Sequence, residues 1–384
     1  MKISFFSNYL THHQIPFCLE MKKREDVEFY FISTQPMEDE RRKGGWAFEE
    51  EYPFEIKAYS SAEAKVQALQ LAAESDVMII GSAPEEYVEY RMKHAATKLT
   101  LRYSERIYKG GRWRVLSPRG AINRLKTYYR YLDKPLYMLC ASAYTAGDLA
   151  MLGSYLGRCY KWGYFPQVYT YDLEELLSKK EKNSLLWVAR MIDWKHPEVP
   201  ILVAKRLKEK GYQFHFKMVG VGPLLDEMKK LIAKYRLEEC VHLIGSMSPQ
   251  EVRGYMESSS IFMFTSDQNE GWGAVLNEAM NSGCAVVANQ QIGSVPFLLN
   301  DGRNGRVYYK NKINKIVKII EDLFNDEEKT LKLGKNAYDT IVNHWSAKNA
   351  TERLVKVCTR LLVGKKEFFE DGPCSKAKIR VKKG

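Results

Sequence analysis

The chain has 384 residues, of which 45% are hydrophobic and 28% are charged, and its formal net charge is +12. The length favours two globular domains, and the composition is typical of a soluble globular protein. No apolar run approaches the roughly 18 residues of a membrane-spanning helix, and residues 1–7 are too short and polar-flanked for a signal peptide. The seven cysteines form no C-x-x-C pair. This favours a reduced, cytoplasmic compartment over a disulfide framework or a cysteine metal site.

Predicted strands and helices alternate through the first half of the chain. Short apolar runs predict strands at residues 3–7, 27–32, 77–80, 98–101 and 136–140. Helical spacing and flanking residues predict helices at 15–23, 62–73, 85–94 and 143–152, the last with Ser142 as its N-cap. Alternation of this kind predicts a doubly wound parallel sheet.

Residues 166–183 interrupt this pattern, because they lack strand character, and we expect them to link two domains. The alternation then resumes, with strands predicted at 185–189, 214–219, 241–244, 261–265 and 285–288. Further helices are predicted at 199–210, 224–235, 248–257, 313–325, 328–343 and 347–362. Ser248 and Glu251 have the spacing of a capping box.

We therefore expect an α/β protein of two Rossmann-like domains, at residues 1–165 and 184–345, that face each other across a cleft. The remaining residues, 346–384, are expected to form a closing helix that packs back on the first domain, followed by a basic tail. A cleft between two domains is a favoured site for a small ligand.

The stretch from 270 to 289 is the most informative part of the sequence. It reads EGWGAVLNEAMNSGCAVVAN, with Glu270 and Glu278 eight positions apart and a helix expected to begin near Gly273 and to end at Gly283. A strand precedes the glycine loop and another follows the helix. Ligands bind at such strand ends in parallel sheets, and a helix N-terminus suits a phosphate.

Several motifs follow one another in a fixed order in the second half of the chain. They are residues 185–195 (LLWVARMIDWK), 218–223 (MVGVGP), 241–245 (VHLIG), 270–273 (EGWG), 278–283 (EAMNSG) and 302–305 (GRNG). In this order they resemble the retaining, two-domain (GT-B) glycosyltransferases of family 4, which build bacterial surface polysaccharides and glycolipids. The resemblance is clearest over residues 184–310.

The resemblance implies roles for individual residues in binding a nucleotide-sugar donor. Arg190 and Lys195 match the family's pair of cations on the diphosphate, and Glu278 matches the carboxylate that accepts hydrogen bonds from the ribose. Glu270 matches the family's acid near the donor sugar. The remaining donor-binding positions are Gly220, Gly222, Gly271, Trp272, Gly273 and Ala274. From the residues alone, the two cations could equally be surface charges and the glycines ordinary turns.

The loop after the first predicted strand supplies further candidates. His12, His13 and Gln14 follow that strand end, and Glu105 follows another. These residues are candidates for the acceptor or for a phosphate, and His13 joins Glu270, Arg190 and Lys195 as a catalytic candidate. The family's glycine-rich loop at this position has no counterpart here. The alternative interpretations are that the paired histidines are simply solvated on the loop and that Glu105 forms a salt bridge.

The activity implied is a hexosyltransferase-type reaction. It moves a sugar from a nucleotide diphosphate, by family frequency UDP, to a saccharide or lipid-linked acceptor with retention of the anomeric configuration. The sequence has no Asp-x-Asp metal motif, so the two cations are expected to replace a metal ion, and no cofactor is expected. A nucleotide-sugar epimerase of the same two-domain architecture is the alternative.

Positive charge is concentrated between residues 109 and 130, where seven Lys and Arg residues are mixed with Trp113, Tyr128 and Tyr129 and with no acid. This composition is typical of segments that dock on an anionic membrane surface, and it also occurs on nucleic-acid surfaces. Because nucleic-acid binding would leave the ordered motifs unexplained, we expect no nucleic-acid partner. We expect a cytoplasmic protein that docks on the inner leaflet through 109–130.

Overall fold

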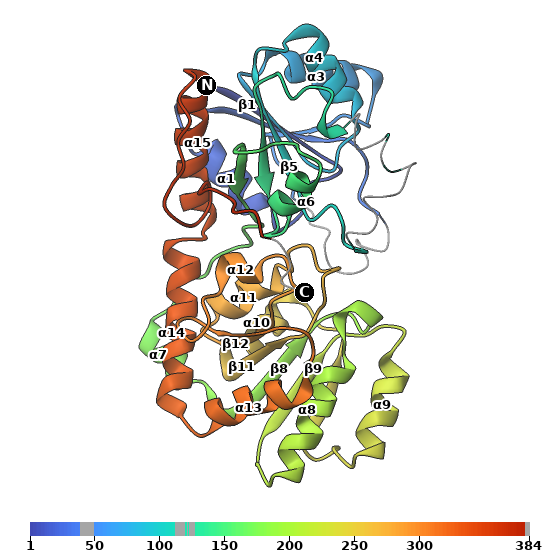
Figure 1. The fold of residues 1–384 in the computed structure, drawn as a ribbon, viewed down its shortest axis with the longest axis vertical. Coiled ribbons are helices and arrows are strands. Elements are labelled where there is room, and N and C mark those ends of the chain that lie inside the picture. The colour runs from blue at the N-terminus through green and yellow to red at the C-terminus, as the bar shows by residue number, and fades with distance from the viewer. Residues whose placement is uncertain (39–49, 112–119, 121, 123–126, 381–384) are drawn as a thin grey trace. The chain divides into compact units, whose positions relative to one another are not determined.

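The computed structural model describes residues 1–38, 50–111, 120, 122 and 127–380 (Figure 1). The chain divides into two compact units. Unit 1 comprises Met1–Gln167 with Trp345–Gly384, and unit 2 comprises Val168–His344. Within the described ranges, no helix has the length and apolar character needed to cross a bilayer.

Unit 1 is built on a parallel sheet whose described strands follow the order β3-β2-β1-β4-β5-β6-β7. The strands are β1 (Lys2–Ser7), β2 (Glu28–Ser33), β3 (Glu55–Lys57), β4 (Val77–Ile80), β5 (Leu99–Ser104), β6 (Leu136–Cys140) and β7 (Cys159–Lys161). All four residues of β4 are buried. Continuous burial of this kind means that both faces of the sheet are covered, as parallel sheets require.

Four of the five described helices of unit 1 pack as two pairs. The five are α1 (Ile15–Lys22), α3 (Ala62–Glu74), α4 (Glu86–His94), α6 (Thr145–Met151) and α15 (Ala347–Leu362). Helix α3 packs beside α4, and α15 packs beside α1 (Figure 1). Leu354 of α15 is fully buried. The C-terminal helix therefore completes unit 1, as expected from the sequence.

Unit 2 is built on a second parallel sheet, with the described strands in the order β10-β9-β8-β11-β12-β13. They are β8 (Glu181–Val188), β9 (His215–Val219), β10 (Val241–Gly245), β11 (Ser259–Phe264), β12 (Ala285–Asn289) and β13 (Arg306–Tyr308). A cluster of buried side chains joins β8, β9 and β11 to the helices, with Trp187, Phe216 and Met263 among its members. The order changes direction beside β8, so β8 and β11 flank the point where ligands bind in such folds.

Eight helices and one 3₁₀ turn accompany this sheet in the described part of unit 2. They are α7 (Leu173–Ser178), η3 (Asp193–Lys195), α8 (Glu198–Glu209), α9 (Leu225–Lys234), α10 (Pro249–Ser258), α11 (Val275–Asn281), α12 (Val295–Leu298), α13 (Ile313–Phe324) and α14 (Glu327–Asn343). Helix α8 packs against α9 and α13, and α11 packs against α10 and α14. The two Rossmann-like folds predicted from the sequence are thus confirmed.

Of the two helix starts predicted at Ser248 and Ser142, one is confirmed and the other is wrong. The capping box is confirmed, since the Ser248 side chain accepts from the Glu251 amide while the Glu251 carboxylate accepts from the Ser248 amide. Ser142 is not an N-cap, because α6 begins at Thr145 with Tyr144 at its N-cap position. The Ser142 hydroxyl instead accepts a hydrogen bond from the Tyr144 amide (3.3 Å) within the preceding turn.

The stretch at 166–183, expected as a connection, carries α7 and the first residues of β8, and residues 168–183 belong to unit 2. Helix α7 is started by Asp172, whose carboxylate accepts from the Glu175 amide (3.0 Å), and it buries Leu176. Its remaining side chains are mainly polar and solvent-facing, which is why the stretch resembles a linker in the sequence.

The loops that follow β8 and β9 lie against one another at the carboxyl edge of the unit 2 sheet. Gly220 has a φ of +131°, and a Cβ placed on it would come 1.9 Å from the carbonyl oxygen of Ala189. A Cβ on Gly222 would come 2.5 Å from the carbonyl oxygen of Met191. Both glycines are therefore required by backbone packing, and they fix residues 189–191, which include Arg190.

We predict that Gly220→Ala lowers the free energy of unfolding by about 2–4 kcal/mol, because it combines backbone strain with a backbone clash. The control is Gly211→Ala, where φ is +83° but no atom lies within 4 Å of the added Cβ. The control should lose only about 1 kcal/mol, for the left-handed conformation. Urea denaturation measures both values, and equal losses would show that the close contact with Ala189 carries no cost.

Candidate functional site

The candidate site lies at the carboxyl ends of β8 and β11 in unit 2. After β8 the chain passes through Arg190 into the 3₁₀ turn η3, which ends at Lys195. After β11 it forms the loop 265–274, which leads into α11 and contains Glu270. The predicted residues Lys195 and Glu270 thus come from two loops at neighbouring strand ends.

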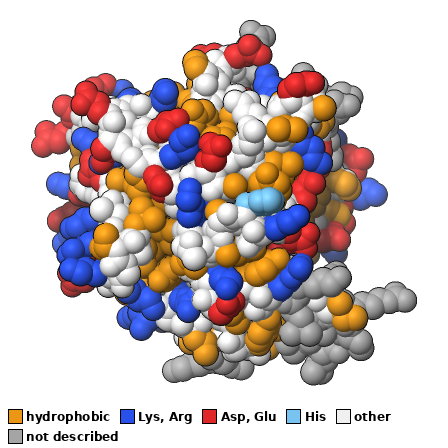
Figure 2. Space-filling model, turned by 90° about the horizontal axis from the view of Figure 1, so that it is seen from above, with side chains coloured by type: hydrophobic (Ala, Val, Ile, Leu, Met, Phe, Trp, Pro, Cys, Tyr) orange, Lys and Arg blue, Asp and Glu red, His pale blue; other side chains and the backbone are white. Residues whose placement is uncertain are grey.

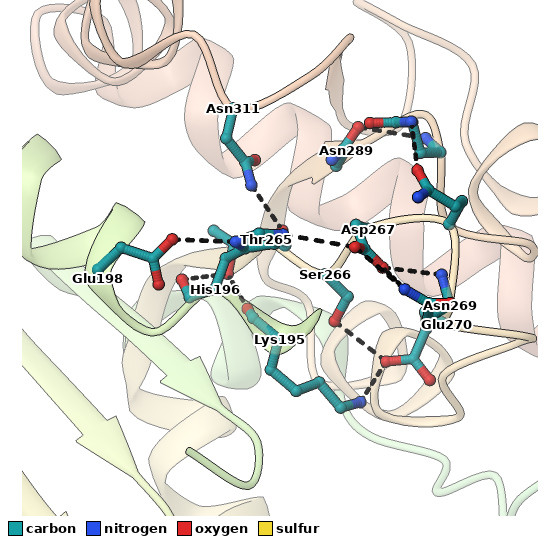
Figure 3. A network of polar contacts seen from close by, with 12 residues as sticks. Lys195, His196, Glu198, Thr265, Ser266, Asp267, Asn269, Glu270, Asn289 and Asn311 are labelled. Carbon is teal, nitrogen blue, oxygen red and sulfur yellow. Dashed lines mark hydrogen bonds and ion pairs between the residues drawn. The ribbon is translucent and has the colours of Figure 1, made fainter. Parts of the chain in front are cut away.

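Lys195 and Glu270 form an ion pair (Figure 3). The Lys195 ammonium donates to Glu270 Oε2, and the Ser266 hydroxyl donates to the same oxygen (3.0 Å). The two charged side chains are only 13% and 9% exposed. Removing one partner from a pair this buried would leave the other charge uncompensated. An ammonium has three donors, so Lys195 can hold Glu270 and contact a second anion at the same time.

Hydrogen bonds from Thr265 and Asp267 join the same two loops. The Thr265 hydroxyl accepts from the Trp187 indole (2.9 Å) and donates to the Lys195 carbonyl (2.8 Å). The Asp267 amide donates to the Trp194 carbonyl (3.0 Å). The position of Lys195 relative to Glu270 is therefore set by the backbone as well as by the ion pair.

Arg190 is exposed at the start of the loop after β8. It shares that loop with Lys195, and its backbone is held between the two glycine contacts described above. Gly220 and Gly222, expected to bind a donor directly, thus have a structural role in shaping the loop that presents Arg190.

The loop 271–274 enters α11 through two residues with specific requirements. Gly273 has a φ of +79°, and a Cβ there would lie 2.4 Å from the Phe264 ring. The Trp272 side chain is fully buried, donates to the Asn277 amide oxygen (2.9 Å) and packs near the Phe297 ring. The indole of Trp272 is therefore part of the core, and only its backbone could serve a ligand.

Gly271 and Ala274 complete this loop and are both buried, and Ala274 is the N-cap of α11. The helix begins at Val275, two residues later than the sequence indicated. The first amides of any helix lack partners within the helix itself. These residues have the small side chains that let a ligand approach the backbone.

Glu278 lies within α11 and is half-buried. Burial raises the pKa of its carboxyl group, and the nearby charge of Arg253 opposes this shift. The Arg253 guanidinium also donates to the Glu278 carbonyl (3.2 Å) and to the Ser282 hydroxyl (3.1 Å). A carboxylate that has lost part of its hydration gains most from hydroxyl donors supplied by a ligand.

In unit 1, three of the predicted residues gather around Tyr164, a residue that the sequence analysis missed. The Tyr164 hydroxyl donates to Glu105 (2.7 Å), and its ring stacks with that of His13 at 6.2 Å between centroids. His13 and Gln14 line a small pocket together with Phe5, Phe17, Tyr103, Trp162, Gly163, Tyr164 and Phe165. Tyr164 lies between the last predicted helix of the first domain and the predicted linker, where no strand or helix pattern marked it.

The other unit 1 candidates have local contacts that limit their roles. Burial lowers the pKa of His12 to about 4, so this imidazole is neutral at pH 7 and offers hydrogen bonds but no charge. Gln14 accepts from the Thr11 amide (3.2 Å) and the Thr11 hydroxyl (3.0 Å), which closes the turn before α1. Glu105 also pairs with Lys109.

In the part of the chain that the structure describes, no group of three His, Cys, Asp or Glu residues could hold a metal ion.

Comparison with known proteins agrees with this geometry. Residues 170–340 match the family described as "Glycosyl transferases group 1". The amylovoran biosynthesis glycosyltransferase AmsK of Erwinia amylovora is 26% identical over 206 residues, which cover 52% of this chain and 50% of AmsK. The putative colanic acid biosynthesis glycosyltransferase WcaL of Escherichia coli is 30% identical over 132 residues, covering 33% and 32%. The chain thus spans between about a third and a half of the length of these relatives.

Solved structures resemble the chain over most of its length. The Anabaena Alr3699/HepE structure in complex with UDP has a TM-score of 0.66 at 16% identity and covers 94% of this chain and 100% of its own. Sucrose-phosphate synthase from Thermosynechococcus elongatus has a TM-score of 0.62 at 16% identity, covering 95% and 100%. At these identities the likeness establishes the fold. Residues 170–340 of this chain thus match the glycosyl transferases group 1 family, and each of the two units has the Rossmann-like fold of these solved glycosyltransferase structures.

Proposed function

We propose that this chain is a retaining glycosyltransferase of family 4, which transfers a sugar from a UDP-sugar to a hydroxyl group of a saccharide or lipid-linked acceptor. The observation that carries the proposal is the Lys195–Glu270 pair, with Arg190 on the same loop, at the carboxyl ends of β8 and β11. These strands belong to the domain that matches the glycosyl transferases group 1 family. Relatives named for amylovoran and colanic acid biosynthesis support a role in bacterial polysaccharide assembly.

UDP is the nucleotide we propose, because HepE has been crystallised with UDP and glucose and shares the fold. The transition state of sugar transfer separates a positive charge on the ring from a negative charge on the leaving diphosphate. Arg190, Lys195 and the backbone amides of 271–274 would stabilise that negative charge by preorganised electrostatics. Glu278 would accept hydrogen bonds from the ribose, which suits a partly desolvated carboxylate.

Glu270 would position the donor sugar. Both of its contacts use Oε2, so Oε1 is the oxygen that could accept a sugar hydroxyl. We propose that retention follows from attack on the same face from which the diphosphate departs, which requires no protein nucleophile. The acceptor would be held in unit 1 by His13, Gln14 and Glu105, with Tyr164 supporting the first and the last of these.

The alternative of a nucleotide-sugar epimerase receives no support, because the family match and the curated relatives described above are glycosyltransferases. The two enzymes differ in one simple test. A glycosyltransferase incubated with UDP-glucose alone leaves the sugar configuration unchanged, whereas an epimerase converts it.

We predict that Arg190→Ala and Lys195→Ala each weaken binding of UDP by about 10–100-fold, the loss expected for one hydrogen bond to a charged group. Lys205→Ala is the matched control, since Lys205 lies on α8 and pairs with Glu209 (2.9 Å). This variant removes one positive charge at a position outside the candidate site. Isothermal titration of the full chain with UDP gives the dissociation constants. Wild-type affinity in both site variants would remove the diphosphate assignment.

The proposal also predicts that a metal ion is dispensable, because two cations would already neutralise the diphosphate. UDP should bind with unchanged affinity after dialysis against EDTA, as measured by the same titration. A loss that is reversed by adding Mg²⁺ or Mn²⁺ would show that the diphosphate is held through a metal.

We further propose that unit 1 docks on the anionic inner leaflet of the plasma membrane through residues 109–130. Residues 112–119, 121 and 123–126 of this segment lie outside the described part of the structure. Within the described part, Ile122 is 59% exposed. On the face drawn in Figure 2, Lys and Arg side chains are interspersed with acidic and hydrophobic ones. The proposal therefore depends on the basic and aromatic composition of the segment.

Docking predicts that the chain sediments with vesicles that contain phosphatidylserine and not with neutral phosphatidylcholine vesicles. The fraction bound should fall steeply as salt is raised, because electrostatic attraction is screened. The control replaces Arg119, Arg124 and Lys126 together by Gln, and it should stay in the supernatant. Equal sedimentation with both kinds of vesicle at low salt would contradict docking by charge.

A further inference from the structure

His196 adopts a backbone conformation that residues other than glycine rarely adopt. It follows Lys195 at the end of η3, with φ of +53° and ψ of +57° in the left-handed region. A residue with a Cβ is strained there. Such strain persists only where the surroundings hold the residue in place, so the contacts of His196 indicate what it does.

The imidazole of His196 lies between two carboxylates that come from different elements (Figure 3). Nδ1 is 2.9 Å from Glu198 Oε1, in the first turn of α8. Nε2 is 3.6 Å from Asp267 Oδ2, in the loop after β11. Both ring nitrogens face an acceptor, an arrangement that only the doubly protonated ring can satisfy with two donors.

The charge of His196 follows from this arrangement. Asp267 first, and then Glu198, raises the pKa of His196 to about 9, while partial burial opposes them. Burial would raise the pKa of Asp267, yet the facing imidazolium of His196 and the hydrogen bonds from Asn269 hold it below its usual range. The preceding residue, Lys195, directs its ammonium to Glu270. At neutral pH the cluster is thus an imidazolium between two carboxylates.

Asp267 is also the residue that shapes the turn leading to Glu270. Its carboxylate accepts from the Asn269 amide (2.8 Å), and its carbonyl accepts from the Glu270 amide (3.2 Å). The contact between His196 and Asp267 therefore connects the residue after Lys195 to the turn before Glu270.

We propose that His196 is a positioning residue whose imidazolium, by bridging Glu198 and Asp267, holds the turn of Lys195 against the loop of Glu270. This inference rests on the proposed function, because the pair it aligns is the proposed donor site. His196 itself touches neither the diphosphate nor the sugar. It acts by keeping Lys195 and Glu270 in the geometry that receives the donor.

The proposal fixes the direction of the pH dependence. The pKa of His196 in the folded chain lies above its ordinary value of 6.5. The stability that the bridge gives the folded chain is therefore complete below about pH 6.5, and the charged bridge itself is lost as the pH rises through about 9. The affinity for UDP should be constant between about pH 6.5 and 8 and should fall by roughly 10-fold between about pH 8 and 10.

Two variants separate the charge of His196 from its shape. His196→Asn tolerates the left-handed backbone but carries no charge, so its affinity for UDP should be roughly 10-fold weaker and flat across this pH window. His196→Lys retains a cation and the backbone strain, so it should recover part of the affinity and move the midpoint of its loss above pH 9. A merely structural histidine would show neither the flat profile nor the shifted midpoint.

A ligand-free measurement distinguishes this proposal from the function on which it rests. Hydrogen exchange at pH 7 should be faster in His196→Asn than in the wild type at the amides of 193–196 and 265–270, and unchanged in β4. His196→Gly, which relieves the strain, should show the same increase if the bridge is what matters. Unchanged exchange in both variants would overturn the positioning role. If exchange is faster in the variants but the wild-type chain fails to bind UDP, the positioning role stands and the proposed function is contradicted.

Discussion

The candidate site depends on the contact between two loops at the ends of β8 and β11. Lys195 and Glu270 are partners across that contact, and both side chains are largely withdrawn from water. A buried ion pair is not by itself a large source of stability, because both charges lose hydration. Its value here is geometric, since the pair is reinforced by Ser266 and by the backbone contacts of Thr265 and Asp267. A cation and an anion are thereby held at fixed positions beside the carboxyl ends of the strands, where parallel sheets bind ligands.

The surrounding residues determine how closely the backbones of neighbouring loops approach each other at this site. Gly220 and Gly222 allow the β9 loop to rest on residues 189–191, and Gly273 allows the chain to turn beneath Phe264. Trp272 fills the core below this turn. His196 is the exception, since it is held in a glycine-like conformation by two carboxylates. We infer that the glycines provide the space for the donor site and that the charged residues set its alignment.

Much of the fold could be predicted from the sequence because buried parallel strands are continuous apolar runs, as in β4 and β12. The strands β3, β7 and β13 were missed because three residues carry no periodicity. Motif order identified Arg190, Lys195, Glu270 and Glu278 as candidates, but the pairing of Lys195 with Glu270 spans 75 positions and no local pattern encodes it. Trp272 was predicted to serve a ligand through its backbone, and the motif gave no sign that its indole is buried in the core. Tyr164 and His196 were missed because their roles depend on partners brought close by folding.

The central claim is that a nucleoside diphosphate binds between Arg190, Lys195 and the backbone of residues 271–274. The most direct measurement is a crystal structure of the full chain with UDP bound. The account predicts that both phosphates lie within hydrogen-bonding distance of the two cationic side chains, with the ribose hydroxyls on Glu278. UDP bound elsewhere in unit 2, with Lys195 and Glu270 making no contact to it, would contradict the account.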